Sequence, residues 1–187
     1  MMKKSLFLMV AVVLLLSLSV LSPVFAEGFP TGEWAVTADA AEPLLQLNAD
    51  GTAQYRGTAY TFEDDGSFLL LTDSQGEVLR LRYRITETDN WLYMPTPYTR
   101  KEGTTGEGIR GIWNQDGSEK GFFEFSEKDT FLEDGVFDGI YKVDYDEGWF
   151  MLSYPQYFGD TVCYFTIDGN HMTVEYPWKL VERKPAE

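Results

Sequence analysis

Two residues of this chain suggest nucleophilic chemistry, Cys163 and His171, its only cysteine and only histidine. A Cys–His mechanism needs the two side chains in hydrogen-bond contact and a thiol that substrate can reach. His171 follows the turn Asp168-Gly169-Asn170 and stands eight residues after Cys163, which is about 25 Å along an extended strand. The spacing therefore predicts a surface histidine beside a turn and no Cys–His pair.

Acidic residues gather in turn-like segments such as Glu63-Asp64-Asp65 and Asp144-Tyr145-Asp146-Glu147. A glycosidase needs two carboxyl groups facing each other across a cleft, one of them buried enough to stay protonated. Carboxylates in turns beside glycine face water, so we predict that the chain is not an enzyme. Asp144 and Asp146 are the calcium candidates, but their spacing does not complete a calcium loop. We therefore expect no metal and no cofactor.

Aromatic residues close to prolines form two groups that could contact a ligand. Flat rings can stack on sugars or anchor a partner protein. Alternatively, these rings close the ends of a barrel or fill an interface within the chain. The candidates for ligand binding are Trp91, Tyr93, Tyr98, Tyr154, Tyr157 and Trp178.

The elements that must position these side chains are short β-strands. No long segment shows helical spacing, and runs rich in β-branched and aromatic residues alternate with Asx-Gly pairs, which tolerate the positive φ of tight hairpins. This pattern predicts an all-β, antiparallel meander barrel. The Asx-Gly pairs are Asp50-Gly51, Asp65-Gly66, Asp116-Gly117, Asp134-Gly135 and Asp168-Gly169.

Between residues 77 and 85, apolar residues alternate with three arginines. This alternation indicates a strand with one face in the core, formed by Leu79, Leu81, Tyr83 and Ile85. The same register applied to a later strand places Cys163 on the inner face, where it acts as a small buried apolar residue. The outer face of that strand carries Val162 and Tyr164 in place of arginines. We therefore expect both to be covered by the other half of the chain.

The chain reads as two copies of one pattern. Gly32-Glu33-Trp34 opens one copy and Gly111-Ile112-Trp113 opens the other, and each copy ends in an Arg-Lys pair. The stretch 102–108 is rich in glycine, lacks apolar residues and is the best linker candidate. We predict one repeat over residues 27–105 and a second over 106–187, packed together or fused into one barrel.

Residues 1–26 have the pattern of a secretory signal peptide, with lysines first, an apolar run next and Ala26 at the end. We expect cleavage after Ala26 and a secreted protein, extracellular or periplasmic. The formal net charge of -15 repels nucleic acid and anionic lipid, so we expect neither a nucleic acid nor a membrane as partner. A single cysteine excludes an intramolecular disulfide.

A Gly-x-Trp in the first strand of an acidic β meander resembles the lipocalin (calycin) superfamily, and more closely the small lipocalin-like domains of secreted bacterial proteins. The resemblance implies that the tryptophan plugs one end of the barrel and that an arginine from the last strand packs across its ring. This pairs Trp34 with Arg100 and Trp113 with Arg183, all as structural residues. Each copy is about half as long as a typical lipocalin, and a small barrel is filled by its own side chains.

These features predict a secreted, non-enzymatic β-barrel binding module whose partner is a small apolar molecule or another protein. Two alternatives stay open. One is a secreted protease inhibitor, since small lipocalin-like barrels serve that role in some secreted bacterial systems. The other is a carbohydrate-binding module, which needs exposed rings. An apolar cavity on the order of several hundred Å³ that opens to solvent would favour small-molecule binding, and a filled interior would favour surface interaction.

Overall fold

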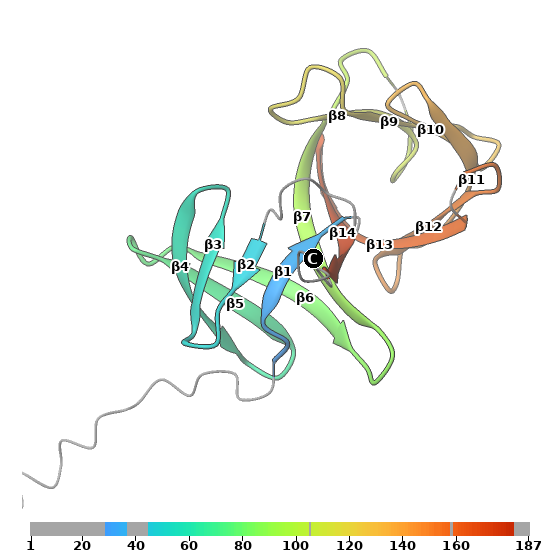
Figure 1. Cartoon of the computed structure of the whole chain (residues 1–187). Coiled ribbons are helices and arrows are strands. Elements are labelled where there is room, and N and C mark those ends of the chain that lie inside the picture. Colours follow the sequence, from blue (N-terminus) through green and yellow to red (C-terminus); the bar gives the residue numbers. More distant parts are fainter. Residues whose placement is uncertain (1–28, 37–44, 105, 158, 182–187) are drawn as a thin grey trace, which may run out of the picture.

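A computed structural model describes residues 29–36, 45–104, 106–157 and 159–181 and shows an all-β protein (Figure 1). These residues form 14 strands and no helix, and every strand pairing is antiparallel, which confirms the predicted class. The part of the chain so described therefore contains no helix that could cross a membrane. The predicted signal peptide, its cleavage point after Ala26, and Arg183 lie outside the described residues.

Seven strands come from each half of the chain, and each strand pairs with the next one along the chain. The glycines of the five predicted Asx-Gly turns have φ between +58° and +86°, the region that a tight turn requires. The first half supplies β1 (Gly32–Ala35), β2 (Leu45–Leu47), β3 (Thr52–Tyr55), β4 (Thr58–Asp64), β5 (Phe68–Asp73), β6 (Val78–Ile85) and β7 (Asn90–Arg100). The second half supplies β8 (Gly111–Gln115), β9 (Phe122–Phe125), β10 (Thr130–Glu133), β11 (Phe137–Asp144), β12 (Trp149–Tyr154), β13 (Gly159–Asp168) and β14 (His171–Leu180).

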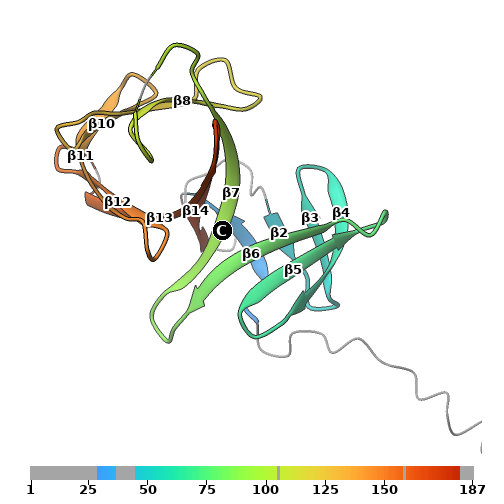
Figure 2. The same ribbon diagram turned by 180° about the vertical axis from the view of Figure 1, so that it is seen from behind.

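The sheet closes into a ring because β1 pairs with β14 as well as with β2. Inside this ring β7 and β14 pair with each other over nine residue pairs, from Thr99–His171 to Trp91–Lys179. The resulting two-stranded ribbon divides the molecule into two lobes, which Figures 1 and 2 show from opposite sides. We call the part with β1–β6 the first lobe and the part with β8–β13 the second lobe.

The long strands β7 and β14 belong to the walls of both lobes. The first part of β7 pairs with β6, and its last residues, 98–100, pair with β8. Likewise, β14 begins beside β13 and ends beside β1. The last strand of each half of the chain therefore closes on the first strand of the other half.

Each lobe has its own apolar core, and Tyr176 on the shared ribbon packs against both. On each ribbon strand every second side chain points inward. One end of this inner face packs in the core of the first lobe, and the other end packs in the core of the second lobe. The first core is mainly aliphatic, with Leu45, Leu47, Leu69, Leu71, Leu81 and Leu92 around Trp34. The second is mainly aromatic, with Phe123, Phe125, Phe131, Phe150 and Phe165 around Trp113.

The predicted inner faces are confirmed in both lobes. Leu81 and Cys163 have no exposed surface, and Leu79, Tyr83 and Ile85 pack against the first core. Cys163 lies in the second core. The period of two along a strand is therefore sufficient to place these side chains.

The prediction for the outer face of β13 holds for only one of its two residues. Tyr164 meets the ring of Tyr93 edge-on, with centroids 5.0 Å apart, and lies 4.1 Å from the guanidinium of Arg82 in the first lobe. Val162 is 39% exposed, so its predicted burial is wrong. The reason is that β13 pairs with the ribbon only from Tyr164 onward, where Tyr164 faces Glu175. Val162 precedes this paired stretch and lies beyond the contact with the first lobe.

Candidate binding site at the end of the second lobe

A short loop before β8 closes one end of the second lobe. Its residue Ile109 is fully buried, and three consecutive carbonyl groups of the loop accept hydrogen bonds from side chains. Arg100 donates to the carbonyls of Gly108, at 2.8 Å, and Arg110. The indole Nε1 of Trp113 donates to the carbonyl of Ile109 at 2.7 Å. These bonds satisfy backbone groups that irregular structure leaves without sheet partners, so the predicted linker runs directly into an anchored loop.

The guanidinium of Arg100 also lies over the ring of Trp113, 4.0 Å from its centroid. The predicted pairing of Arg100 with Trp34 is therefore wrong. It fails because β7 continues into the second lobe, where Arg100 faces Trp113 across the β7–β8 pair. On β14 the residue that faces Trp34 is Leu180, while Arg183 lies outside the described residues.

Glycine begins both β1 and β8 because a neighbouring side chain comes close at each position. Gly32 has a φ of 133° and Gly111 a φ of 121°, a region that side chains strongly disfavour. A Cβ on Gly111 would lie 2.7 Å from Nη1 of Arg100, and one on Gly32 would lie 3.1 Å from Cδ1 of Leu180. The two Gly-x-Trp segments thus occupy similar surroundings, with an arginine in one and a leucine in the other.

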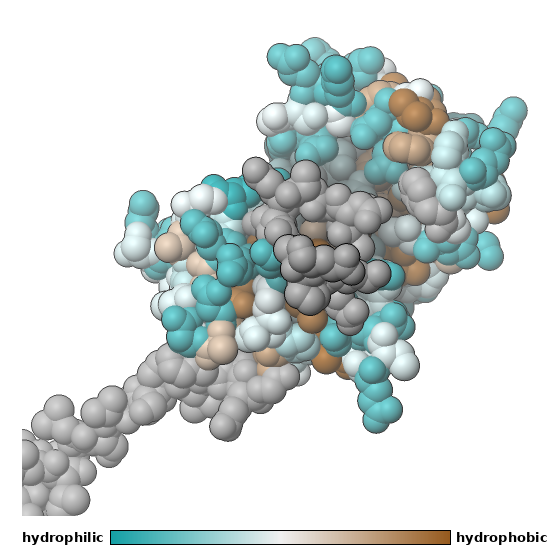
Figure 3. All heavy atoms as spheres, in the orientation of Figure 1, coloured by the Kyte–Doolittle hydropathy of each residue, from teal (hydrophilic) through white to brown (hydrophobic). Residues whose placement is uncertain are grey.

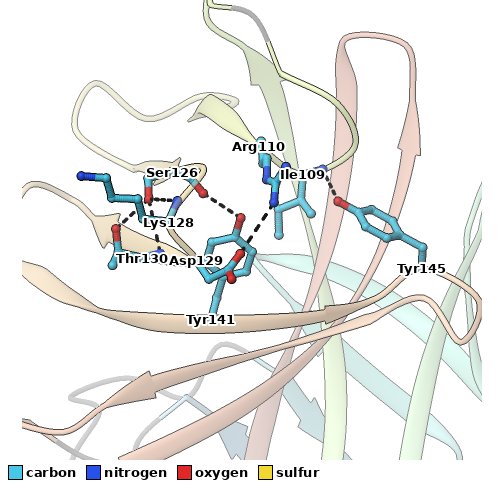
Figure 4. Close-up of polar contacts among 8 residues, drawn as sticks. All are labelled: Ile109, Arg110, Ser126, Lys128, Asp129, Thr130, Tyr141 and Tyr145. Carbon is cyan, nitrogen blue, oxygen red and sulfur yellow. Dashed lines mark hydrogen bonds and ion pairs between the residues drawn. The ribbon is translucent and has the colours of Figure 1, made fainter.

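A half-open hollow of about 390 Å³ lies beside the loop of the second lobe. Three segments meet there: the loop before β8, the turn between β9 and β10, and β11 with the turn after it. Figure 4 shows several of the lining side chains with their polar contacts. The lining consists of Glu107, Gly108, Arg110, Asp129, Tyr141, Val143 and Tyr145.

Tyr145 forms one wall of the hollow and is held from two sides. Its hydroxyl accepts a hydrogen bond from the backbone N–H of Ile109 at 3.1 Å, and its ring meets Phe165 edge-on at 5.9 Å between centroids. Gly108 leaves the space that this hydroxyl needs, since a Cβ there would collide with it. Tyr145 is nevertheless 54% exposed. An exposed ring that is already fixed loses little conformational entropy when a ligand binds.

The opposite wall is built by Tyr141 and the β9–β10 turn (Figure 4). The Tyr141 hydroxyl donates to the carbonyl of Ser126 at 2.9 Å, and its backbone N–H donates to the carbonyl of Asp129 at 2.9 Å. Burial raises the pKa of Tyr141, and a hydrogen bond with Tyr141 raises the pKa of Arg110. Both groups therefore keep their protons at neutral pH.

Hydrogen-bond donors and acceptors stand side by side in this hollow. Nη2 of Arg110 lies 3.7 Å from Oδ1 of Asp129, and both side chains are well exposed. Such a surface ion pair contributes at most about 1 kcal/mol, so a ligand can rearrange it at low cost. Glu107 adds a second carboxylate, and the Tyr145 hydroxyl still has its proton to donate. This arrangement suits a ligand with many hydroxyl groups.

Inside the second lobe, the half-buried carboxyl of Glu133 and three phenols form a polar cluster. The hydroxyls of Tyr154 and Tyr176 donate to Glu133 at 2.6 and 3.3 Å, and those of Tyr98 and Tyr176 lie 3.1 Å apart. Burial raises the pKa of Glu133 above its ordinary value of 4.5, and raises the pKa of the three phenols too. Burial likewise raises the pKa of the Cys163 thiol, which leaves it a poor nucleophile.

The other residues considered for chemistry serve local structure. His171 begins β14 at the surface, with Nδ1 3.4 Å from Oγ1 of Thr99. Oδ1 of Asp144 accepts the backbone N–H groups of Asp146 and Glu147, each at 3.0 Å, so it is occupied by its own turn. Across residues 29–36, 45–104, 106–157 and 159–181, no three His, Cys, Asp or Glu side chains gather in a way that could hold a metal ion.

The six aromatic residues predicted to bind a ligand are spread over the molecule, and none lines the hollow. Four of them, Tyr93, Tyr98, Tyr154 and Trp178, are at most 5% exposed. Trp91 is half-buried beneath the ammonium group of Lys179, which lies 4.3 Å from the ring centroid. Only Tyr157 is widely exposed, at 44%, and its hydroxyl donates to the carbonyl of Val136 at 3.1 Å.

The residues that line the hollow were not predicted, because the sequence around them is typical of other kinds of segment. Tyr145 stands inside an acidic run that reads as a solvated turn, and Arg110 follows a glycine-rich stretch that reads as a linker. On the face shown in Figure 3, apolar residues appear as small areas among hydrophilic ones. Comparison with protein families, curated proteins and solved structures gives no match to this chain.

Proposed function

We propose that this protein is a secreted, non-enzymatic binding module that holds a neutral sugar unit of an extracellular glycan in the hollow beside Tyr145. One observation carries this proposal: the fixed, exposed ring of Tyr145 stands in the same hollow as the Arg110–Asp129 pair. An aromatic face packs on the apolar face of a sugar ring. Carboxylate oxygens accept from sugar hydroxyls and a guanidinium donates to them.

Binding of a small apolar molecule has less support than sugar binding. The second lobe is filled by its own rings, with Phe123 5.2 Å from Phe125 and 6.1 Å from Tyr176 between centroids. The hollow outside this core has polar residues on both walls. An apolar ligand would have to desolvate these polar groups without satisfying them, which is unfavourable.

The fold part of the proposal is that the lobes are tandem lipocalin-like repeats, over residues 27–105 and 106–187. Three features support it. Each half supplies seven strands, each opens with a glycine of positive φ, and each places a fully buried tryptophan two residues later. The difference from a single barrel is that each lobe is closed by the last strand of the other half.

The test is binding of the chain to a printed array of neutral and anionic glycans, followed by calorimetric titration with the best neutral hexasaccharide. We expect saturable binding that Tyr145→Ala weakens about tenfold or more, because the stacking ring is lost. Tyr145→Phe keeps the ring but loses the bond to Ile109, so it should weaken binding less.

Tyr157→Ala is the matched control, since it removes another exposed tyrosine that lies outside the hollow. It should leave the affinity unchanged. Two results contradict the proposal: no binding to any neutral glycan, or binding that Tyr157→Ala abolishes and Tyr145→Ala does not. Thermal unfolding of each variant shows whether it still folds.

A further inference from the structure

A group of basic side chains lies on the outer face of the first lobe, although the chain carries a formal net charge of -15. Across the sheet, Leu70 faces Arg80, and Phe68 faces Arg82. In the next row Arg84 faces Trp91, which in turn faces Lys179 on β14. Residues directly opposite each other in neighbouring strands point to the same side of a sheet. We call the group Arg80, Arg82, Arg84 and Lys179 the basic face.

Three of these four cations lie over the faces of aromatic rings. The guanidinium of Arg80 lies 4.1 Å from the centroid of Phe68, and Nζ of Lys179 lies 4.3 Å from that of Trp91. A cation held on a ring is attracted by the ring's negative face. A guanidinium that stacks in this way keeps its N–H groups, which point outward in its plane, free to bind an anion.

Three of the four cations are available to a partner. Arg82 is already used, because its Nε donates to Oε2 of Glu175 at 3.1 Å while its guanidinium stacks on Tyr164. Arg80, Arg84 and Lys179 are exposed and form no salt bridge within the described part of the chain.

The spacing of the free cations limits which anion can fit. Arg80 and Arg84 are four residues apart on β6, which is about 13 Å, and Arg84 and Lys179 lie two strands apart, which is about 10 Å. A nucleic acid carries about one charge per 1.7 Å of duplex, far more than three cations can neutralise. The acidic remainder of the surface would repel such a dense polyanion. A polymer with widely spaced carboxylates brings fewer charges and meets this repulsion less.

We propose that the basic face binds an anionic polysaccharide of the polyuronate type, with its carboxylates held by Arg80, Arg84 and Lys179. The half-buried ring of Trp91 lies between Arg84 and Lys179 and holds the ammonium group of Lys179 over its face. This surface is separate from the hollow in the second lobe, since none of its residues lines that hollow. The two proposals therefore stand or fall independently.

The experiment is calorimetric titration of the chain with an alginate hexamer at low and high salt. The test variant combines Arg80→Gln, Arg84→Gln and Lys179→Gln. The control variant combines Lys120→Gln, Lys128→Gln and Lys142→Gln, which removes the same charge from exposed positions in the second half of the chain. Arg84→Gln alone is a milder variant, because no ring contact is lost with this side chain.

We expect saturable binding that weakens with salt and falls about tenfold or more in the test variant, because charge contacts are removed. The control variant should bind as the original chain does, and Arg84→Gln should fall between them. Equal loss in both triple variants would mean that only net charge matters, and this would overturn the proposal. Absence of binding, or tighter binding of single-stranded DNA of matched length, would overturn it as well.

Discussion

The two lobes share one frame but differ in how the tryptophan that opens each of them is held. In the second lobe the indole N–H of Trp113 donates to the carbonyl of Ile109, and Arg100 covers its ring. In the first lobe the indole N–H of Trp34 is buried without a hydrogen-bond partner. Leu180 of β14 is paired with Trp34 across the sheet, as Arg100 of β7 is with Trp113. The strand arrangement that both lobes share therefore needs only a buried indole ring. The polar contacts found in the second lobe fix the loop beside the hollow.

A second difference explains why the hollow has an exposed ring. In the first lobe the phenol comes from a strand, since Tyr83 of β6 donates to Asp64 at the end of β4 at 2.9 Å. In the second lobe Phe165 of β13 packs edge-on against Tyr145, which comes from the turn after β11. The first lobe therefore holds Tyr83 on a strand beside its core, and the second lobe holds Tyr145 in a turn at the surface.

The largest difference between the lobes should follow loss of the indole ring. Trp113→Phe removes a hydrogen bond, leaves the carbonyl of Ile109 unsatisfied and shrinks the ring under Arg100, so it should lower the free energy of unfolding by about 3 kcal/mol. Trp34→Phe breaks no hydrogen bond and should cost about 1 kcal/mol. Urea unfolding of both variants measures the difference. Equal costs would show that the polar anchoring of Trp113 contributes nothing.

A smaller difference should follow from closing the space at the two glycines. Gly111→Ala places a methyl group against Arg100 in a backbone region that alanine disfavours, and should cost about 2 kcal/mol. Gly32→Ala meets only the flexible end of Leu180 and should cost about 1 kcal/mol less. The check is the unfolding midpoint of both variants, with Gly57→Ala as control, since its φ is 80° but nothing lies nearby. A larger cost at Gly32 than at Gly111 would contradict the assignment.

The smallest effect concerns Glu133, a half-buried carboxyl in the second lobe. The pKa of Glu133 is raised by burial, so the folded state holds its proton more tightly than the unfolded state does. Its contribution is complete below the ordinary pKa of 4.5 and is lost as the pH rises through the raised value. Glu133→Gln keeps a partner for Tyr154 and cannot ionise. It should therefore gain stability relative to the original chain as the pH rises, by up to about 1 kcal/mol.

The measurement is urea unfolding of the original chain and of Glu133→Gln from about pH 4 to about pH 8. All other titrating groups are common to both proteins. The difference between their free energies of unfolding therefore reports on Glu133 alone. The control variant is Glu124→Gln, which removes an exposed carboxyl on the neighbouring strand β9. If the stability difference between Glu133→Gln and the original chain does not change with pH, or falls as the pH rises, it would contradict the raised pKa of Glu133.

Strands and inner faces could be predicted from the sequence because both depend on local pattern. Alternation from Leu79 to Ile85 and the glycines of the Asx-Gly turns are enough to set them. The exchange of closing strands could not be predicted. Arg100 has the same neighbours in the sequence whether β7 ends in its own lobe or runs on into the next. Only the contacts made by the 11 residues of β7 decide between the two.

The site was harder to predict because burial in this fold depends on long-range contacts. Trp178 and Tyr98 stand near prolines, as exposed binding residues often do. On the shared ribbon, however, their side chains point into the cores of the first and second lobes. Tyr93 points outward from the ribbon and is covered by Tyr164 from the other half. Conversely, the acidic neighbours of Tyr145 gave no sign that its ring would be fixed against a loop 36 residues earlier.

The proposed sugar site beside Tyr145 in the second lobe is tested most directly by an amide NMR titration of the labelled chain with a neutral hexasaccharide. We predict saturable shifts at Gly108, Ile109 and Tyr145, with the amides around Trp34 unchanged. Shifts that gather in the first lobe or around Tyr157, or no saturable shift at all, would contradict it.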